Sequence, residues 1–240
     1  MKLFNGDCLE LMEEIPEKSV DMVLCDLPYG TTDCRWDNII PFEPLWKHYE
    51  RVTKENGAIV LFSAQPFTTK LIHSNLKQFR YCWYWKKANV TGFSYARYQP
   101  MRCIEDICVF YKKTPKYKPQ GLKKLEKPIK RNKKAKDIEI YRKGLSGASE
   151  QKYTNYPKHL LEYSKDAENI HPTQKPVALL EYLIKTYTDE RETVLDNCMG
   201  SGSTGVASVN TNRRFIGIEK DKTYYRLAKD RIESMGMNIA

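Results

Sequence analysis

The sequence lacks the marks of a membrane protein, of a secreted protein and of a metal centre. Its 240 residues are 41% apolar, and no apolar run approaches the length of a membrane span. The seven cysteines contain no Cys-x-x-Cys pair and the four histidines are scattered, so the spacing typical of a zinc site is missing. Acidic residues occur from Asp7 onward, which argues against a secretory signal. We therefore expect a cytoplasmic protein with reduced cysteines, no metal and no membrane contact.

Acidic residues are also nearly absent from one tract, residues 112–136. The chain has a net charge of +10, and this tract holds twelve basic residues against the single acidic residue Glu126. Clustered lysine and arginine gain affinity for phosphates by releasing counterions. A solvated basic loop is the alternative, but so strong a segregation favours a nucleic-acid contact. The residues expected to make it are Lys112, Lys113, Lys123, Lys124, Lys130, Arg131, Lys133 and Lys134.

Strand and helix patterns alternate on both sides of this tract. Strands are predicted at residues 1–5, 20–25, 58–62, 79–85, 107–111, 193–196 and 215–218, and helices at residues 9–14, 42–54, 65–76, 177–187, from near 203, and 221–234. This alternation predicts an α/β fold with a mainly parallel, doubly wound sheet covered by helices on both faces. Residues 112–169 break the pattern because they are basic, polar and rich in tyrosine. We expect residues 1–111 and 170–240 to be two halves of one domain, with residues 112–169 as a functional or partly disordered insert.

An acidic turn, Asp26-Leu27-Pro28-Tyr29-Gly30, follows a predicted buried strand. Pro28 lacks an amide hydrogen and Gly30 permits unusual backbone angles, so the strand cannot continue. The turn thus stands past the carboxyl end of a strand, where ligands of open α/β sheets bind. The Asp26 carboxylate and a nearby backbone carbonyl are acceptors suited to an amino group, and Tyr29 offers a face for a planar ring. A capping aspartate beside a packed tyrosine is the simpler alternative.

A glycine-rich turn after the predicted strand at residues 193–196 suggests a second site. Gly200 and Gly202 let the backbone approach a ligand, and the helix that begins near residue 203 favours negative charge. Glu219 ends the next predicted strand, where a carboxylate can accept both hydroxyls of a ribose. This order is typical of a nucleoside-binding half-sheet. The spacing of the glycines, with Gly205, also matches G-x-G-x-x-G, so the motif alone leaves NAD open, as well as a plain turn.

Three motifs together resemble the DNA amino-methyltransferases that use S-adenosylmethionine. Asp26-Leu27-Pro28-Tyr29 is similar to the catalytic D-P-P-Y motif of that family. Residues 196–204 resemble its cofactor turn, and residues 171–176, His-Pro-Thr-Gln-Lys-Pro, match its H-P-T-Q-K-P segment. Their order fits the permuted β class, in which the catalytic motif precedes the recognition region and the cofactor turn. The resemblance covers nearly the whole chain and implies the Rossmann-like methyltransferase fold.

The resemblance implies a role for each matching residue. Asp26, Pro28 and Tyr29 would be catalytic, with Asp26 and the Pro28 carbonyl accepting the hydrogens of the target amine while Tyr29 stacks on the flipped base. Asp7 and Cys8 would meet the cofactor adenine, Glu219 the ribose, and the glycine turn the methionine part. The residues expected to bind the cofactor are Asp7, Cys8, Asp26, Thr173, Lys175, Asp196, Gly200, Ser201, Gly202, Ser203 and Glu219. Two departures from the motifs, Leu27 and Asn197, replace prolines. Leu27 is expected to make the catalytic turn less rigid, and Asn197 to alter only the local geometry of the cofactor turn.

An acid at the first catalytic position goes mostly with adenine N6 in this family, so Asp26 favours double-stranded DNA with adenine as the target. Cytosine N4 is the alternative target, and RNA stays open as a substrate. No Pro-Cys pair occurs, which argues against carbon methylation of cytosine. A dinucleotide-dependent oxidoreductase and a non-catalytic DNA-binding module are competing hypotheses. A homodimer and a cognate restriction enzyme are further partners that the family suggests.

Overall fold

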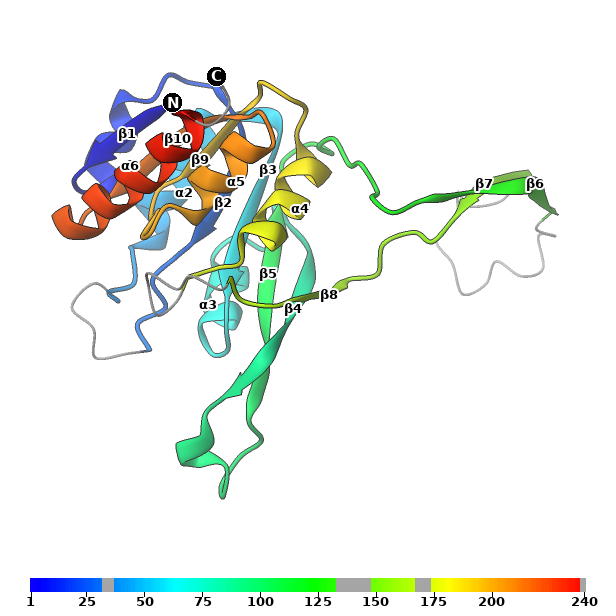
Figure 1. Cartoon of the computed structure of the whole chain (residues 1–240), viewed down its shortest axis with the longest axis horizontal. Coiled ribbons are helices and arrows are strands. Elements are labelled where there is room, and N and C mark those ends of the chain that lie inside the picture. The colour runs from blue at the N-terminus through cyan, green and yellow to red at the C-terminus, as the bar shows by residue number, and fades with distance from the viewer. Residues whose placement is uncertain (32–36, 133–147, 167–173, 238–240) are drawn as a thin grey trace. The chain divides into compact units, whose positions relative to one another are not determined.

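The computed structural model describes residues 1–31, 37–132, 148–166 and 174–237 (Figure 1). The chain divides into two compact units, one made of Met1–Lys118 with His159–Ala240 and the other of Pro119–Lys158. The second unit is shorter than the predicted insert at residues 112–169, because both ends of that segment belong to the first unit. The functional division at residues 112 and 169 stays a prediction.

The first unit is built on a mixed, mostly parallel sheet. Among the described residues the sheet has eight strands in the order β1-β10-β9-β2-β3-β5-β4-β8. Their bounds are β1 Lys2–Asn5, β10 Arg214–Glu219, β9 Thr193–Asp196, β2 Val20–Asp26, β3 Thr53–Ser63, β5 Arg102–Phe110, β4 Phe79–Thr91 and β8 Leu160–Tyr163. Neighbouring strands in the series β1, β10, β9, β2 and β3 are all parallel. β5 is antiparallel to β3 and β4, and β8 is parallel to β4. The predicted α/β fold with a mainly parallel sheet is confirmed.

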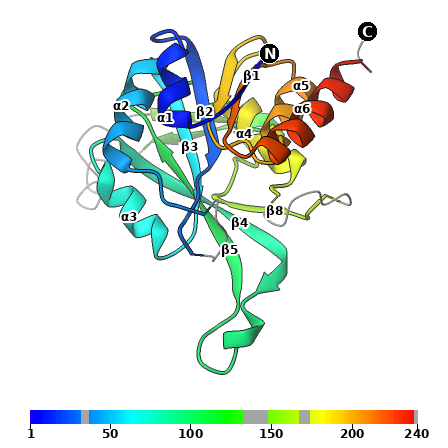
Figure 2. The same ribbon diagram turned by 90° about the vertical axis from the view of Figure 1, so that its left-hand side faces the viewer.

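Helices cover both faces of this sheet, as Figure 2 shows. One layer contains α1 Cys8–Leu11, α2 Phe42–Val52 and α3 Phe67–Ser74, and the other α4 Val177–Tyr187, α5 Ser203–Asn210 and α6 Lys222–Met237. Side chains alternate across β2: Val23 and Cys25 pack into the core with α2 and α3, while Met22 and Leu24 pack with α4 and α5. A strand buried on both faces needs this continuous apolar run, which is why the sequence made it recognisable.

Several predicted boundaries differ from the observed elements. The helix predicted at residues 9–14 is α1 followed by the 3₁₀ turn η1, Met12–Glu14, and the helix predicted at 65–76 is shortened to α3. β3 begins at Thr53, so the last two residues of the helix predicted at 42–54 belong to this strand. β4 and β5 are longer than predicted and are joined through the 3₁₀ turn η2, Phe93–Tyr95. The residues of β4 beyond Lys87 are exposed, so apolar periodicity gave no signal there.

The second unit contains an antiparallel strand pair where no regular structure was predicted. β6, Lys123–Asn132, pairs with β7, Ala148–Thr154. Asn155 donates a hydrogen bond from its amide to the Gly121 carbonyl at 2.7 Å. Backbone pairing gives these polar residues a regular structure that side-chain patterning does not encode.

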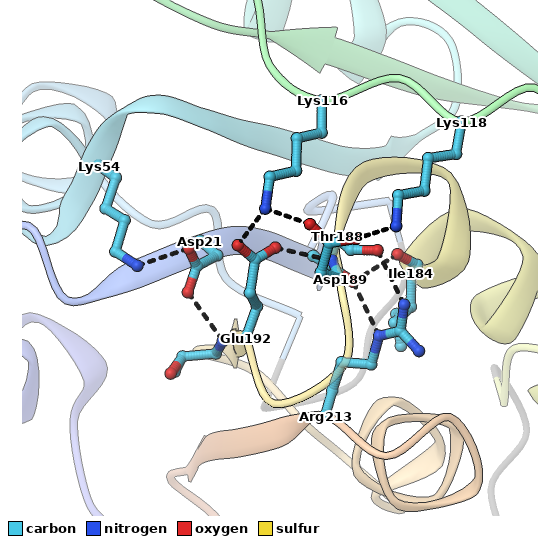
Figure 3. Close-up of polar contacts among 10 residues, drawn as sticks. Asp21, Lys54, Lys116, Lys118, Ile184, Thr188, Asp189, Glu192 and Arg213 are labelled. Atoms are coloured by element: carbon cyan, nitrogen blue, oxygen red, sulfur yellow. Dashed lines mark hydrogen bonds and ion pairs between the residues drawn. The ribbon is translucent and has the colours of Figure 1, made fainter.

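A polar network at the amino ends of the strands attaches residues 116–118 to the first unit (Figure 3). Lys54 and the Thr193 amide both donate to the Asp21 carboxylate, at 2.6 and 2.9 Å. Lys116 pairs with Asp189 and, at 2.5 Å, with Glu192, and Lys118 also pairs with Asp189. These contacts lie at the edge of the sheet opposite to the Asp26 turn.

Candidate active site

The Asp26 turn and the glycine turn lie at the same edge of the sheet. β2 and β9 are parallel, with Met22 opposite Val194 and Val23 opposite Leu195. Both strands therefore end at the same side, and Asp26, the last residue of β2, lies only a short distance beyond Asp196 at the end of β9. The negative charge of Asp26 is close enough to act on the Asp196 carboxyl. Two motifs about 170 residues apart in sequence are thus neighbours in space.

The Asp26 carboxylate is held by two donors. The Tyr29 hydroxyl donates to Oδ1 at 2.7 Å, and the Lys175 ammonium donates to Oδ2 at 2.5 Å. Burial raises the pKa of Asp26 above its usual value, although Lys175 opposes that rise. Phe67 stacks on Tyr29 with 5.1 Å between ring centroids. These contacts fix the Asp26 carboxylate and the Tyr29 ring, two of the groups that the sequence analysis assigned to the target base.

The turn itself is stabilised by a residue that the sequence analysis missed. Asp37 is buried, and its two carboxylate oxygens accept the amides of Gly30 at 2.8 Å and Thr31 at 2.9 Å. Gly30 has a φ of +65°, a conformation that glycine adopts readily. Leu27, the departure from the family motif, is 3% exposed and packs in the core beside Phe67. An apolar side chain therefore anchors the turn where the family has a proline.

Glu105 on β5 is a second acid of the site that the sequence analysis missed. Its carboxylate lies 3.4 Å from the Lys175 ammonium and 3.1 Å from the Lys87 ammonium. Burial would lower the pKa of Lys175, but Asp26 and Glu105 together outweigh burial and raise it. Burial would likewise raise the pKa of Glu105, but the two lysines outweigh it and lower that pKa. One buried ammonium is therefore shared between two carboxyl groups.

Residues 174 and 175 connect the two turns. The side-chain amide oxygen of Gln174 lies 3.4 Å from the Ser201 hydroxyl of the glycine turn, whereas the Lys175 ammonium donates to Asp26. The predicted contact of Lys175 with the cofactor remains a prediction. In this structure its ammonium lies between Asp26 and Glu105. Thr173, also predicted to bind the cofactor, lies outside the described residues.

The glycine turn is shaped by two residues with positive φ, Gly200 at +50° and Gly202 at +79°. A Cβ at Gly202 would come within 3.0 Å of the Ala228 side chain, so close packing against α6 requires glycine. A Cβ at Gly200 would meet nothing within 4 Å, so this side of the turn is open. The buried Ser203 hydroxyl accepts a hydrogen bond from Arg231 at 3.0 Å.

Glu219, Asp7 and Cys8 meet at the neighbouring end of the sheet. Gly6 donates its amide to the Glu219 carbonyl at 3.0 Å, which joins the start of α1 to the end of β10. The Glu219 carboxylate accepts the amides of Gly200 and Asp221, and burial raises its pKa. Asp7 caps α1 by accepting the Leu9 amide at 2.9 Å. Its predicted contact with the cofactor adenine, like that of buried Cys8, is untested.

Asn197, the second departure from the family motifs, is buried behind the glycine turn. Its side-chain oxygen accepts the Tyr49 hydroxyl at 2.6 Å. Its side-chain nitrogen lies 3.6 Å from the Cys8 sulfur and 3.5 Å from the Cys198 sulfur. The amide thus links the turn to α2 and α1 through polar contacts that a proline could not make.

Asp196 gives a prediction about stability against pH. It is 3% exposed, and burial raises its pKa to about 6 from 3.8. Because the folded-state pKa is raised, the free energy of unfolding should fall as pH rises from 4 to 7. Asp196→Asn keeps an acceptor for the Cys198 amide and should remove up to about 3 kcal/mol of that fall. Urea unfolding at both pH values measures this, and an unchanged pH dependence would contradict it.

The residues predicted to bind nucleic acid are divided between the two units of the chain. Lys112 and Lys113 lie 3.0 and 3.5 Å from Glu55, at the edge of the sheet opposite to Asp26. The predicted contact of these two lysines with nucleic acid stays a prediction. Lys123, Lys124 and Lys130 are exposed on β6 of the second unit, which also contains Arg131 in its strand. Lys133 and Lys134 lie outside the described residues.

Comparison with known proteins identifies the family. The family model described as DNA methylase (N6_N4_Mtase) matches residues 20–230. Type II methyltransferase M.HpaI of Haemophilus parainfluenzae is 26% identical over 97% of this chain and 74% of its own length. The crystal structure of M1.HpyAVI with S-adenosylmethionine has a TM-score of 0.66 at 24% identity and covers 96% of this chain and 98% of its own. PvuII cytosine-N4-specific DNA methyltransferase has a TM-score of 0.70 at 17% identity, covering 99% and 91%.

The chain therefore belongs to the S-adenosylmethionine-dependent DNA amino-methyltransferases of the N6-adenine and N4-cytosine family. The expected Rossmann-like methyltransferase fold and the expected cofactor are confirmed. The residues present fit this cofactor, since the backbone at Gly200 is open and Glu219 places a carboxylate beside it. No helix among the described residues is long and apolar enough to cross a membrane.

Proposed function

We propose that this protein methylates the exocyclic N6 amine of a flipped adenine in double-stranded DNA. The observation that carries the proposal is the Asp26 carboxylate, fixed by Tyr29 and Lys175 at the sheet edge that also bears the glycine turn. S-adenosylmethionine supplies an electrophilic methyl group when bound. We expect Gly200, Ser201, Gly202 and Ser203 to hold its methionine part and Glu219 its ribose.

The amine must be oriented because its lone pair is delocalised into the base. Asp26 and the Pro28 carbonyl accept its two hydrogens, which favours a pyramidal nitrogen with its lone pair directed at the methyl group. Phe67 packs on one face of Tyr29, so the other face is the surface on which the base stacks. That stacking offsets part of the few kcal/mol needed to flip the base. No residue needs to form a covalent bond with the base.

Cytosine N4 is the second candidate target, favoured by the structural likeness to the PvuII enzyme. Both amines present two hydrogens to the same acceptors, and Asp26 favours adenine on the family pattern stated above. A restriction–modification context is proposed from the type II relative. Homodimerisation is a prediction that the single chain does not address.

Methyl transfer to unmethylated, PCR-amplified bacterial DNA tests the proposal. We expect tritium from labelled S-adenosylmethionine to enter the DNA and to elute with N6-methyl-2′-deoxyadenosine after digestion to nucleosides. Label in N4-methyl-2′-deoxycytidine would overturn the adenine assignment and keep the family activity. The absence of label in DNA, with transfer to RNA or to neither, would contradict the proposed substrate.

A further inference from the structure

We propose that the hairpin tip, residues 92–101 between β4 and β5, contacts the DNA duplex beside the target base through aromatic rings and arginine. This inference rests on the proposed function, because it takes the ligand at the Asp26 turn to be a base drawn from a duplex. The hairpin tip lies outside both the Asp26 turn and the basic tract, and none of its residues was assigned a role by the sequence analysis.

The strand register places the hairpin tip at the edge where the base must enter. Asp26 lies opposite Phe62 of β3, and Phe62 lies opposite Ile107 of β5. β5 is antiparallel to β3, so its residues before Asp106 extend past the end of β3 on the Asp26 side. Figures 1 and 2 both show β4 and β5 continuing beyond the other strands of the sheet. The hairpin tip is therefore at the side of the sheet on which DNA must lie.

The base of the hairpin is attached to the site itself. Glu105 on β5 and Lys87 on β4 form an ion pair at 3.1 Å, and Glu105 also faces Lys175 beside Asp26. The two strands are paired here, with Trp85 opposite Glu105 and Lys86 opposite Ile104. Because the base of the hairpin is attached beside the catalytic carboxylate, its tip is held at a fixed distance from the target amine.

The hairpin tip exposes large rings on an ordered turn. Phe93 is 82% exposed, Tyr95 59% and Tyr98 86%. Backbone hydrogen bonds from Tyr95 to Gly92 and from Tyr98 to Tyr95 hold the turn. Exposed apolar groups gathered on one ordered element indicate an interaction surface. Rings of this kind can stack on bases that are unpaired by flipping, which fits a position beside the target base.

Charge favours nucleic acid over protein as the partner. Residues 86–104 contain four basic residues and no acidic residue. Lys86 and Lys87 pair with Glu162 and Glu105, whereas Arg97 and Arg102 are exposed side chains near the rings. Alternating rings and arginines match bases and phosphates at once, because arginine pairs with phosphate oxygens and rings stack on bases.

Equilibrium binding of a fluorescein-labelled duplex of PCR-amplified DNA tests the hairpin tip. Phe93→Ala and Tyr98→Ala should each weaken binding about tenfold, and Arg97→Gln should lower the slope of log affinity against log salt by about one phosphate contact. Leu76→Ala is the matched control, since Leu76 is an apolar side chain 62% exposed near the opposite edge of the sheet. It should bind DNA as the wild type does.

Two further readouts separate the possible outcomes. S-adenosylmethionine affinity and thermal unfolding should stay unchanged in the tip variants, because these residues lie outside the core. If both ring variants bind DNA as tightly as the wild type, the hairpin-tip contact is overturned. The proposed activity is unaffected by that result, because labelled methyl transfer by the wild type tests it separately. A change from dimer to monomer in sedimentation, with DNA affinity retained, would also overturn it by making the hairpin tip a surface for self-association.

Discussion

Asp26→Ala should lower kcat for methyl transfer at least about a thousandfold, the scale of removing a group aimed at the reacting centre. The carboxylate is one of two acceptors that orient the amine, and no neighbouring side chain in the described site can replace it. Glu105 is held by Lys87 and Lys175, and its carboxylate lies on another strand. Single-turnover transfer of labelled methyl to DNA measures the loss.

Two controls make this result specific to the chemistry. S-adenosylmethionine affinity should change less than about threefold, since the glycine turn and Glu219 stay intact and Lys175 keeps a carboxylate partner in Glu105. Glu17→Ala removes an exposed carboxylate in the loop before β2, far along the strand from Asp26, and should leave kcat unchanged. Full activity of Asp26→Ala would end the proposed mechanism.

Glu105→Gln should lower kcat by about 10- to 100-fold, and it should also shift the pH dependence of kcat. Glu105 shares the Lys175 ammonium, so without its charge that ammonium is bound more closely to Asp26 and competes with the target amine. The negative charge of Glu105 also raises the pKa of Asp26. Activity falls as pH drops through the pKa of Asp26, so removing the charge of Glu105 should move this acidic limb to lower pH.

The pH shift distinguishes a positioning residue from a structural one. Glu162→Gln is the matched control because Glu162 forms an exposed pair with Lys86 at 3.3 Å on the neighbouring strands. Exposed pairs of this kind contribute less than about 1 kcal/mol, so the control should keep both kcat and its pH profile. A reduced kcat with an unmoved acidic limb in Glu105→Gln would mean that Glu105 acts only on folding.

The parts of the site that could be predicted are short sequence motifs that lie at the end of a single strand. Residues 193–196 and 177–187 were predicted as the strand and helix that the structure contains. Because parallel strands end at one edge of a sheet, two motifs that each come at the end of a strand can lie close together, and Asp26 and Asp196 do so. The packing of Leu27 and the hydrogen bonds of Asn197 show that both motif departures are accommodated by their neighbours.

The parts that could not be predicted depend on pairing between distant segments. Glu105 enters the site because β5 runs antiparallel to β3, a register that the sequence of β5 does not state. Asp37 reaches back to Gly30 through a turn without periodicity. The basic tract seemed uniform in sequence, yet Lys112 and Lys113 are paired with Glu55 from another strand. Charge counting along a chain misses such partners.

The proposed function requires the base at the Asp26 turn and the cofactor at the glycine turn to bind side by side, and calorimetric binding of a bisubstrate compound tests this most directly. The compound joins the N6 atom of an adenosine, by a short linker, to the 5′ carbon of a second adenosine that bears the amino-acid chain of the cofactor. We expect it to bind at least tenfold tighter than S-adenosylmethionine, and Asp26→Ala to remove that advantage. Binding no tighter than the cofactor alone, or an advantage that survives in Asp26→Ala, would contradict the account.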